Sequence, residues 1–458
     1  MKDFEAQLVA AGMSQPEAQA KMALFAQCDA ALPHKRESLS SSSVPRKRES
    51  MLPPIAYFVP GRIEVLGKHT DYAGGRSLLC AIERGFAVLA TPRDDANVCA
   101  VAVQRGETRI VSLDSREQPE PGDWATYVST VVRRVARDFP TAKRGMDIAF
   151  ASDLPAASGM SSSSALVIAV FLALRDVNRL DEDPIYQTAI TSREDLGEYL
   201  GALENGRPFG AMEGGLGVGT LGGSQDQTAI LCCEAGMLSR YSFCPVRAEG
   251  TFPSPADHCF VLAYSGVAAE KTASARLRYN EASLAVSEIL DIWNRATART
   301  DRCLGDAVSS APDAAADIRA LLQQRDSAEF SRQRLLDRFD QFRAETYDII
   351  PKASAAFARG DLAAIGEEVA RSQDGVERLL GNQVPETIGL VCMARELGAD
   401  AASAFGAGFG GSVWAFIATD HAHDFVQAWR ATYAEGFPDA SSRAEFMVTR
   451  PGPGAMRL

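Results

Sequence analysis

Residues 61 to 75, GRIEVLGKHTDYAGG, combine glycines with basic, acidic and imidazole side chains, and so could contribute to a phosphate or catalytic site. A phosphate-binding P-loop has Gly, four spacers, Gly-Lys and then Ser or Thr, whose hydroxyl reaches the metal. Here five residues separate Gly61 from Gly67, and His69 follows Lys68. Both departures argue against a P-loop, so we expect the phosphates of any nucleotide elsewhere in the chain.

The stretch LPAASGMSSSSALV, residues 154 to 167, is the best candidate for an anion site. A predicted strand ends at Leu154, a turn of small residues follows, and an apolar helix begins inside the serine run. Free backbone N–H groups and the helix dipole favour anions at such a helix start. Any one of Ser161 to Ser164 could be only an N-cap, but four consecutive hydroxyls exceed what capping requires.

Carboxylates accompany a second glycine-rich stretch, residues 202 to 232, which contains Glu204, Glu213 and Asp226. A carboxylate at a glycine-lined site can orient a hydroxyl group or bind magnesium. Taken alone, Asp226 would be assigned to a solvated turn. A third glycine cluster, FGAGFGG at residues 405 to 411, allows two backbones to approach closely, although tight turns have the same composition.

The elements that must position these residues form two α+β blocks, joined near residues 245 to 252. From Ile55 onward, short apolar runs broken by glycine predict strands. Residues 124 to 139 and 165 to 180 have helical patterns, and the second of these helices is apolar enough to be buried. The second block opens with a predicted strand at residues 259 to 266 and continues in long helical stretches.

The N-terminal region precedes these blocks. Residues 1 to 30 have a helical pattern that predicts a short helical hairpin packed on the body of the protein. Residues 32 to 50 repeat KRES around a serine run and have almost no apolar side chains, which predicts a mobile connector. A phosphorylation site or a nucleic-acid contact is the less favoured interpretation of this segment.

Composition limits the possible functions. The 458 residues carry a formal charge of -12, so the global field repels nucleic acids and anionic membranes, and we expect neither as a partner. The sequence contains no run of about 18 apolar residues and no signal peptide at its start, which predicts a cytoplasmic protein. The nine cysteines show no C-x-x-C spacing, which argues against a disulfide framework and structural zinc.

The glycine-rich segments occur together and in one order, and this ordered set resembles the GHMP kinases, most closely those of the galactokinase type. GRIEVLGKHTDYAGG is similar to the galactokinase signature, and LPAASGMSSSSA to the phosphate loop of the superfamily. GGSQDQTAIL resembles the segment that carries the catalytic aspartate, and FGAGFGG resembles the third motif. Weaker similarities lie at WATYV and SARLRYN. The resemblance spans residues 55 to 415.

The resemblance implies a two-domain GHMP kinase fold of the α+β class. It would consist of an N-terminal ribosomal-S5-like domain at residues 51 to 248 and a C-terminal ferredoxin-like α/β domain at residues 249 to 458, with the active site between them. Residues 1 to 50 would be a helical extension and a serine-rich linker. The implied activity is ATP-dependent phosphorylation of the anomeric hydroxyl of a hexose or hexuronic acid. The alternatives are a GHMP kinase for another small-molecule alcohol, and a catalytically silent sugar and ATP sensor.

The resemblance also implies a role for individual residues. Asp226 would be the catalytic residue beside the anomeric hydroxyl, and Arg62 would hold it ionised and neutralise charge on the transferred phosphoryl group. The sugar pocket would be lined by Lys68, His69, Asp71, Tyr72 and Tyr279. ATP would be bound by Pro155, Ser158, Gly159, Met160, Ser161, Ser162, Ser163, Ser164 and Gly408. The Mg²⁺ ligands would be Ser163 and Glu204, with Glu213 as a competitor because extra glycine-rich residues precede Asp226.

Lys68 and Glu64 depart from the galactokinase pattern, which has glutamate and asparagine at these places. An ammonium group cannot accept a hydrogen bond from a sugar hydroxyl, but it suits an anionic group such as a uronic acid carboxylate. This favours a hexuronate substrate such as galacturonate over galactose. The alternative is that Lys68 turns to solvent or pairs with Glu64. Ser403 and the pair Ser224-Gln225 are further departures, and they put the identity of the sugar in doubt.

Overall fold

The computed structural model describes residues 3–32, 54–114, 123–155, 159–268, 273–325 and 327–458. Most of the predicted connector and the predicted ATP contact Ser158 lie outside these ranges. In the described part of the chain, no helix combines the length and apolar character that a bilayer crossing needs. All nine cysteines are free, as expected from their spacing.

The larger of two sheets has eight strands, ordered β12-β1-β2-β5-β3-β4, with β6 paired to β2 and β7 to β6. All pairs are antiparallel except β3 with β5. The strands are β1 (Ile55–Leu66), β2 (Arg76–Pro92), β3 (Asn97–Ala102), β4 (Glu107–Ser112), β5 (Met146–Ser152), β6 (Met237–Ser242), β7 (Arg247–Pro253) and β12 (Met456–Arg457).

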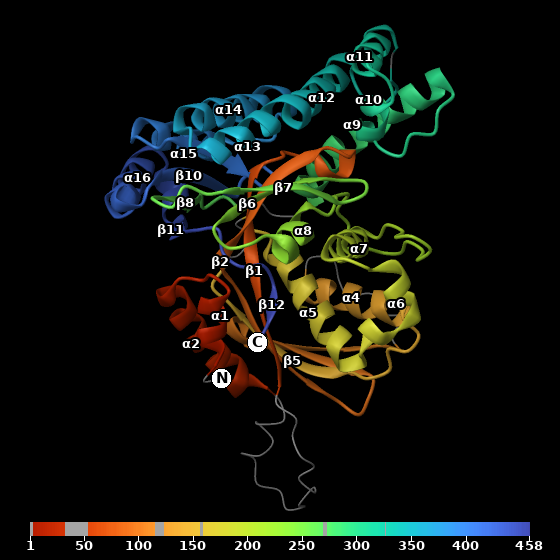
Figure 1. Ribbon diagram of the computed structural model, residues 1–458, viewed down its shortest axis with the longest axis vertical. Coiled ribbons are helices and arrows are strands. Elements are labelled where there is room, and N and C mark those ends of the chain that lie inside the picture. The colour runs from red at the N-terminus through yellow and green to blue at the C-terminus, as the bar shows by residue number, and fades with distance from the viewer. Residues whose placement is uncertain (1–2, 33–53, 115–122, 156–158, 269–272, 326) are drawn as a thin grey trace, which may run out of the picture.

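Helices cover both faces of this sheet (Figure 1). The helices of one face are α4 (Ala125–Asp138), α5 (Ser162–Asn178), α6 (Pro184–Ala189), α7 (Arg193–Asn205) and α8 (Gln225–Cys232), and those of the other are α1 (Phe4–Ala10) and α2 (Gln15–Ala31). Alternate residues of β1 serve the two faces, since Tyr57 and Val59 pack with α5 while Ala56 and Phe58 pack with α2. The predicted N-terminal hairpin and the buried helix near residues 165 to 180 are therefore confirmed.

The smaller sheet has four antiparallel strands in the order β11-β8-β10-β9. Its strands are β8 (His258–Tyr264), β9 (Ala401–Phe405), β10 (Ser412–Ala418) and β11 (Glu445–Thr449). One face packs against α13 (Ile350–Arg359) and α14 (Leu362–Gly375), and the other against α15 (Pro385–Glu396) and α16 (Ala422–Gly436). The first of these cores also contains Ile63 and Leu78 of the larger sheet, so the two halves share buried surface.

The remaining elements are a helical arm in the second half and short segments in both halves. A helical arm is formed by α9 (Ala273–Thr297), α10 (Leu304–Ser309), α11 (Ala314–Gln324) and α12 (Arg332–Ala344), in green to teal in Figure 1. Two π-helical segments follow, η5 (Glu345–Ile349) and η6 (Val376–Leu380). The short elements are η2 (Asp71–Ala73), η3 (Val103–Arg105), η4 (Leu180–Glu182), η7 (Thr419–His421) and α17 (Pro438–Ser441).

These two sheets match the α+β class and the two blocks expected from the sequence. The join expected near residues 245 to 252 is itself part of a strand, β7. The chain also returns to the larger sheet at its end, where Met456 and Arg457 pair with β1. The second block therefore ends on the sheet of the first.

The N-terminal hairpin is tied to the body by a buried ion pair. Lys21 on α2 is fully buried, and its Nζ lies 2.6 Å from Asp153 Oδ2 and 2.6 Å from Glu17 Oε2. Asp153 follows β5 and also accepts a hydrogen bond from the Gly85 backbone N at 2.8 Å. The hairpin is thereby held at the base of the loop that leads into α5.

Removing an aromatic side chain from the buried face of α2 tests how firmly the hairpin packs on the sheet. Phe25 is fully buried, and we expect Phe25→Ala to lower the free energy of unfolding by about 3 kcal/mol, because transfer and cavity costs add. The measurement is urea denaturation of the full chain. Gln27→Ala, at an exposed position of the same helix, should change it by less than about 0.5 kcal/mol. Equal effects of the two variants would contradict the packing described here.

Candidate active site

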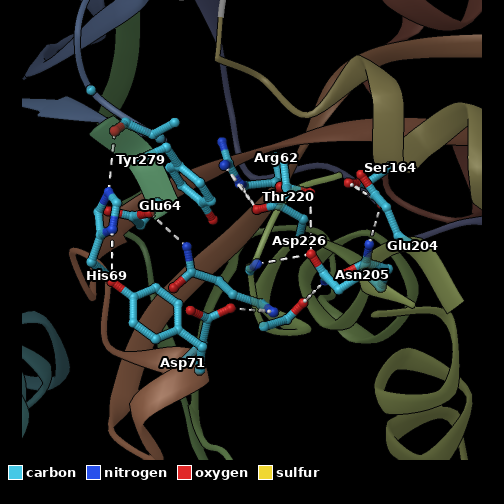
Figure 2. A pocket seen from close by; sticks show the side chains of 18 of the residues that line it. Arg62, Glu64, His69, Asp71, Ser164, Glu204, Asn205, Thr220, Asp226 and Tyr279 are labelled. Carbon is cyan, nitrogen blue, oxygen red and sulfur yellow. Dashed lines mark hydrogen bonds and ion pairs between the residues drawn. The ribbon is translucent and has the colours of Figure 1, made fainter. Parts of the chain in front are cut away.

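A cavity opens where the larger sheet, the helical arm and the loop between β9 and β10 meet (Figure 2). It collects residues that are far apart in the sequence, and this convergence is typical of a functional site. Its described lining comprises Arg62, Glu64, His69, Asp71, Tyr72, Ser164, Glu204, Asn205, Thr220, Gly222, Gly223, Gln225, Asp226, Gln227, Tyr279, Gly406, Ala407, Gly408 and Phe409.

Arg62 and Asp226 meet at the centre of the cavity. Arg62 Nε and Nη2 lie 2.9 and 2.8 Å from Asp226 Oδ1, and Ser161 Oγ donates to Asp226 Oδ2 at 2.5 Å. Asp226 stands in the first turn of α8, where the helix dipole favours a negative charge. The buried guanidinium and the helix terminus therefore both place positive charge next to Asp226.

Irregularities in the pairing of β1 with β2 direct the side chain of Arg62 toward the cavity. The register of β1 against β2 shifts between Pro60 and Arg62 and again between Glu64 and Leu66, and such bulges redirect side chains next to functional sites. Arg62 also donates from Nη1 to Gly159 O at 2.6 Å and from its backbone N to Met160 O at 3.4 Å. One arginine thus connects β1, α8 and the loop before α5.

The predicted phosphate loop turns sharply into α5. Gly159 and Ser161 have positive φ angles of 79° and 60°, and Ser162 to Ser164 form the first turn of the helix. The loop lies against the glycine cluster after β9, since a Cβ at Gly406 would come 3.1 Å from Gly159 O. Of the predicted ATP contacts, Ser164 and Gly408 line the cavity, whereas Pro155, Gly159, Met160, Ser161, Ser162 and Ser163 are not among its lining residues.

Glu204, at the end of α7, is the buried carboxylate nearest to this helix start. Its Oε2 accepts hydrogen bonds from Ser164 Oγ at 2.9 Å and from Gln227 Nε2 at 2.6 Å. The competing Glu213 is exposed and does not line the cavity, so the geometry favours Glu204 as a metal ligand. Ser164, which contacts Glu204, is the residue after the predicted ligand Ser163 in the first turn of α5.

A magnesium ion fits this arrangement only with help from a bound ligand. In the described ranges, no group of three or more His, Cys, Asp or Glu side chains could hold a metal. Mg²⁺ commonly takes one or two protein oxygens and completes its shell with phosphates and water. The buried Glu204 carboxylate and an adjacent serine hydroxyl would supply such a partial set.

Asn205 explains how the extra glycine-rich residues before Asp226 are accommodated. Its Oδ1 accepts from Gly222 N at 2.8 Å and from Thr220 Oγ1 at 3.1 Å, and its Nδ2 donates to Gly223 O at 3.0 Å. The inserted loop is thereby closed back onto the end of α7. Sequence reasoning missed Asn205, Thr220, Gln225 and Gln227, and their only signal is their position beside Glu204 and Asp226.

Asp71 lies at the opposite side of the cavity from Glu204 (Figure 2). Its Oδ2 accepts a hydrogen bond from Gln225 N at 3.1 Å, and burial raises the pKa of the Asp71 carboxyl above its usual range. A Cβ at position 223 would approach Asp71 Oδ2 to 2.3 Å, so only glycine fits there. The inserted glycine loop therefore packs directly on this carboxylate.

His69 and Tyr72 form a fixed pair beside Asp71. His69 Nε2 lies 3.1 Å from Ala407 O, and because a carbonyl can only accept, Nε2 carries the proton. Nδ1 then accepts from Tyr72 Oη at 2.9 Å, which requires a neutral imidazole. Burial, the largest influence, and the nearby Arg338 lower the pKa of His69 to about 4, in agreement with this tautomer. The Tyr279 ring lies 5.1 Å from the His69 ring.

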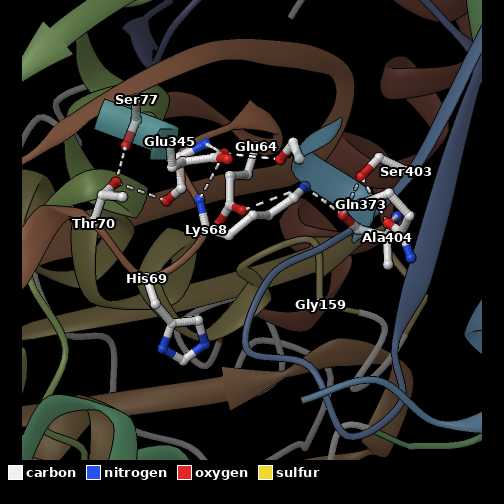
Figure 3. A network of polar contacts seen from close by, with 12 residues as sticks. Glu64, Lys68, His69, Thr70, Ser77, Gly159, Glu345, Gln373, Ser403 and Ala404 are labelled. Carbon is white, nitrogen blue, oxygen red and sulfur yellow. Dashed lines mark hydrogen bonds and ion pairs between the residues drawn. The ribbon is translucent and has the colours of Figure 1, made fainter. Parts of the chain in front are cut away.

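Lys68, predicted to line the sugar pocket, is not among the residues that line the cavity. Its side chain is buried, and its Nζ donates to Ala404 O and lies 3.6 Å from Glu64 Oε1 (Figure 3). Burial lowers the pKa of Lys68 and raises that of Glu64, while the two opposite charges act against both shifts. Of the two predicted positions of Lys68, the structure therefore shows the one in which it pairs with Glu64. Its side chain extends toward β9 and away from the cavity.

The backbone around Lys68 is held from the other half of the molecule. Glu345 Oε1, from η5, accepts from Gly67 N at 2.8 Å and from Lys68 N at 3.4 Å. Ser403 is not among the described lining residues of the cavity, and it donates to Gln373 Oε1 at 2.9 Å. Glu64 faces the cavity in place of Lys68, and its Oε2 accepts from Gln225 Nε2 at 2.6 Å.

Three family models match the chain in order. The galactokinase galactose-binding signature matches residues 47–92, the GHMP kinases N terminal domain residues 126–206, and the GHMP kinases C terminal domain residues 353–435. The first match contains Arg62 and Asp71, and the second contains the phosphate loop and Glu204. The models therefore cover several segments that build the cavity, whereas the segment with Asp226 lies between the second and third matches.

Curated relatives agree with these models. A galactokinase from Chloroflexus aggregans is 27% identical over 380 residues, which are 82% of this chain and 87% of the relative. A galactokinase from Actinobacillus pleuropneumoniae is 34% identical over 145 residues, which are 32% of this chain and 38% of that relative. The chain thus matches less than half the length of the second relative.

Solved structures share the fold. The crystal structure of Lactococcus lactis galactokinase complexed with galactose has a TM-score of 0.72 at 25% identity, covering 88% of this chain and 95% of that chain. The mevalonate kinase of Methanococcus jannaschii has a TM-score of 0.51 at 12% identity, covering 88% and 99%, and shows the fold alone. Family models, relatives and fold together show that this chain belongs to the GHMP kinases and is galactokinase-like.

Proposed function

We propose that the chain is a cytoplasmic kinase that transfers a phosphoryl group from ATP to the anomeric hydroxyl of a hexose or hexuronic acid, giving sugar 1-phosphate and ADP. The observation that carries this proposal is the contact between Arg62 and Asp226 at the cavity wall, next to the loop that opens α5. Phosphoryl transfer needs alignment and charge compensation more than covalent chemistry. The nine free cysteines suit a reducing compartment.

The proposed roles follow from position. Asp226 orients the acceptor hydroxyl and takes its proton, and Arg62 keeps that carboxylate ionised while compensating charge on the transferred group. Backbone N–H groups at the start of α5 suit the ATP phosphates. Glu204 and Ser164 would hold Mg²⁺, which when bound neutralises phosphate charge. A silent sensor would not need a guanidinium beside the carboxylate, so the pair favours an enzyme.

Electrostatics favour a neutral hexose over a hexuronate. The cavity is lined by the acidic residues Glu64, Asp71, Glu204 and Asp226, whereas Arg62 is the single Lys or Arg among its described lining residues. The ammonium of Lys68, which a uronate carboxylate would require, is paired with Glu64 instead. A neutral sugar would donate hydroxyl hydrogen bonds to Asp71, which has two acceptor oxygens.

The sugar preference can be measured directly. We expect kcat/KM for galactose to exceed that for galacturonate by about 100-fold, because an unpaired carboxylate in this cavity would cost about 3 kcal/mol. A coupled assay of ADP release on both sugars checks this. Equal or faster turnover of galacturonate would restore the hexuronate hypothesis, and absence of ADP release with a broad panel of sugars would favour the sensor.

Replacing the central carboxylate tests the catalytic assignment. Asp226→Asn should lower kcat by about 1,000-fold or more while ATP affinity changes only a few-fold, because the amide cannot accept the proton. ADP release and titration with a non-hydrolysable ATP analogue measure the two quantities. Asp374→Asn, on the exposed face of α14, is the matched control and should retain activity. Unchanged turnover in Asp226→Asn would remove this residue from the reaction.

A double-mutant cycle tests the pair between Lys68 and Glu64. Lys68→Met alone should lower the free energy of unfolding by about 3 kcal/mol, because it leaves the buried Glu64 carboxylate without its counter-charge. Adding Glu64→Gln should recover most of that loss, giving a coupling free energy above about 1 kcal/mol in denaturant titrations. Strictly additive effects would mean that the two side chains do not interact.

A further inference from the structure

A second cavity lies on the face of the larger sheet that α4 to α8 cover. It shares no described lining residue with the first cavity. Its walls come from β1, the end of α5, the α6–α7 connection, the end of α8 and the chain's last residues. Its polar lining is formed by Tyr57, Arg175, Tyr186, Thr191, Ser192, Arg193 and Arg457. The reaction proposed above uses none of these residues.

Three arginines, Arg175, Arg193 and Arg457, line this cavity, and no acidic residue is among its described lining residues. In a chain with a formal charge of -12, this is a local field of the opposite sign. Three cationic groups around one concave surface attract small anions. Arginine's planar fork is well suited to phosphate and carboxylate oxygens.

The neighbouring carboxylates do not cancel this charge. Asp176, behind the wall, accepts from Arg175 Nε at 3.0 Å and lies 3.1 Å from Arg457 Nη1, so it serves two arginines. Arg193 Nη2 donates to a carbonyl, Ala455 O, at 2.6 Å. Asp195 is occupied with the start of α7, where it accepts from Ser192 N at 3.0 Å. Asp195 keeps its negative charge, so Asp176 and Asp195 together offset two of the three arginines and one positive charge remains in excess.

Other features of the wall suit a phosphate group with an organic body. Arg193 is the first residue of the 13-residue helix α7, so the positive end of that helix dipole lies at the cavity. The remaining lining is apolar, with Leu172, Ile190, Leu196 and Leu231. Such a mixture of a cationic end and an apolar wall is typical of small-molecule sites.

The cavity also lies at the far ends of helices that reach the first cavity. Helix α5 carries Ser164 at its start and Arg175 in its last turn, and α7 begins at Arg193 and carries Glu204 near its end. Helix α8 packs against both, with Asp226 at its start and Leu231 at the second cavity. A ligand here would contact three elements that position the proposed catalytic and metal-binding groups.

We propose that this second cavity is a binding site for a small oxyanion, namely the phosphate group of free phosphate or of a small phosphate monoester, held by Arg175, Arg193 and Arg457. The proposal does not depend on the proposed function, because it concerns binding at a separate surface. Arg193 and Arg457 are exposed enough to be replaced without disturbing the core.

Calorimetric titration tests the proposal, with the first cavity saturated by Mg²⁺ and a non-hydrolysable ATP analogue. The probes are inorganic phosphate and glycerol 3-phosphate. We expect one further equivalent to bind to the unmodified protein, and Arg193→Gln/Arg457→Gln to weaken binding at least about tenfold, because charge-assisted contacts are lost. Tighter binding of glycerol 3-phosphate than of inorganic phosphate would assign the site to an organic phosphate. Equal binding of the two probes would assign it to free phosphate.

The matched control is Arg302→Gln/Arg378→Gln, which removes two charges from exposed positions of the other half of the molecule. It should bind both probes as the unmodified protein does, so that a general loss of charge is separated from loss of the site. Undiminished binding in Arg193→Gln/Arg457→Gln would overturn the proposal. The same conclusion would follow if neither probe bound to the analogue-saturated protein.

Discussion

The ion pair between Arg62 and Asp226 is the interaction on which the arrangement of the first cavity depends. Arg62 is buried on a bulged strand, and it contacts a helix start and two carbonyls of the loop before α5. Removing either charge would leave the other without its main partner in a poorly solvated place. The same pair that suits phosphoryl transfer therefore also fixes the relative positions of three separate segments.

Other buried charges are compensated locally in the same way. Lys68 is paired with Glu64, Lys21 with Asp153 and Glu17, and the Glu345 carboxylate accepts backbone N–H groups of the loop that carries Lys68. Because burying an unpaired charge is costly, a buried ammonium group is stable when a partner within the protein compensates its charge in the absence of a ligand. This is why the charge of Lys68 does not define the substrate, although its residue type suggests that it could.

The likeness to galactokinases extends over most of the chain, whereas the departures are concentrated around one buried network. Glu64, Lys68 and Ser403 differ from the family pattern, and the structure places them in adjacent contacts on one side of the loop (Figure 3). Changes that compensate one another in charge and volume preserve the fold. The groups at the centre of the cavity, Arg62 and Asp226, keep the family's residue types.

The sequence by itself determined the α+β class, the N-terminal hairpin and the order of the glycine motifs, because periodicity and turn residues are local properties. The ordered motifs also predicted that Arg62 and Asp226 belong to the same catalytic site. Only the tertiary structure decided that Lys68 faces Glu64, that Ser164 contacts Glu204, and that Asn205 closes the inserted loop. Those outcomes depend on which side chains compete for space and charge across elements distant in sequence, and spacing along the chain carries no record of that competition.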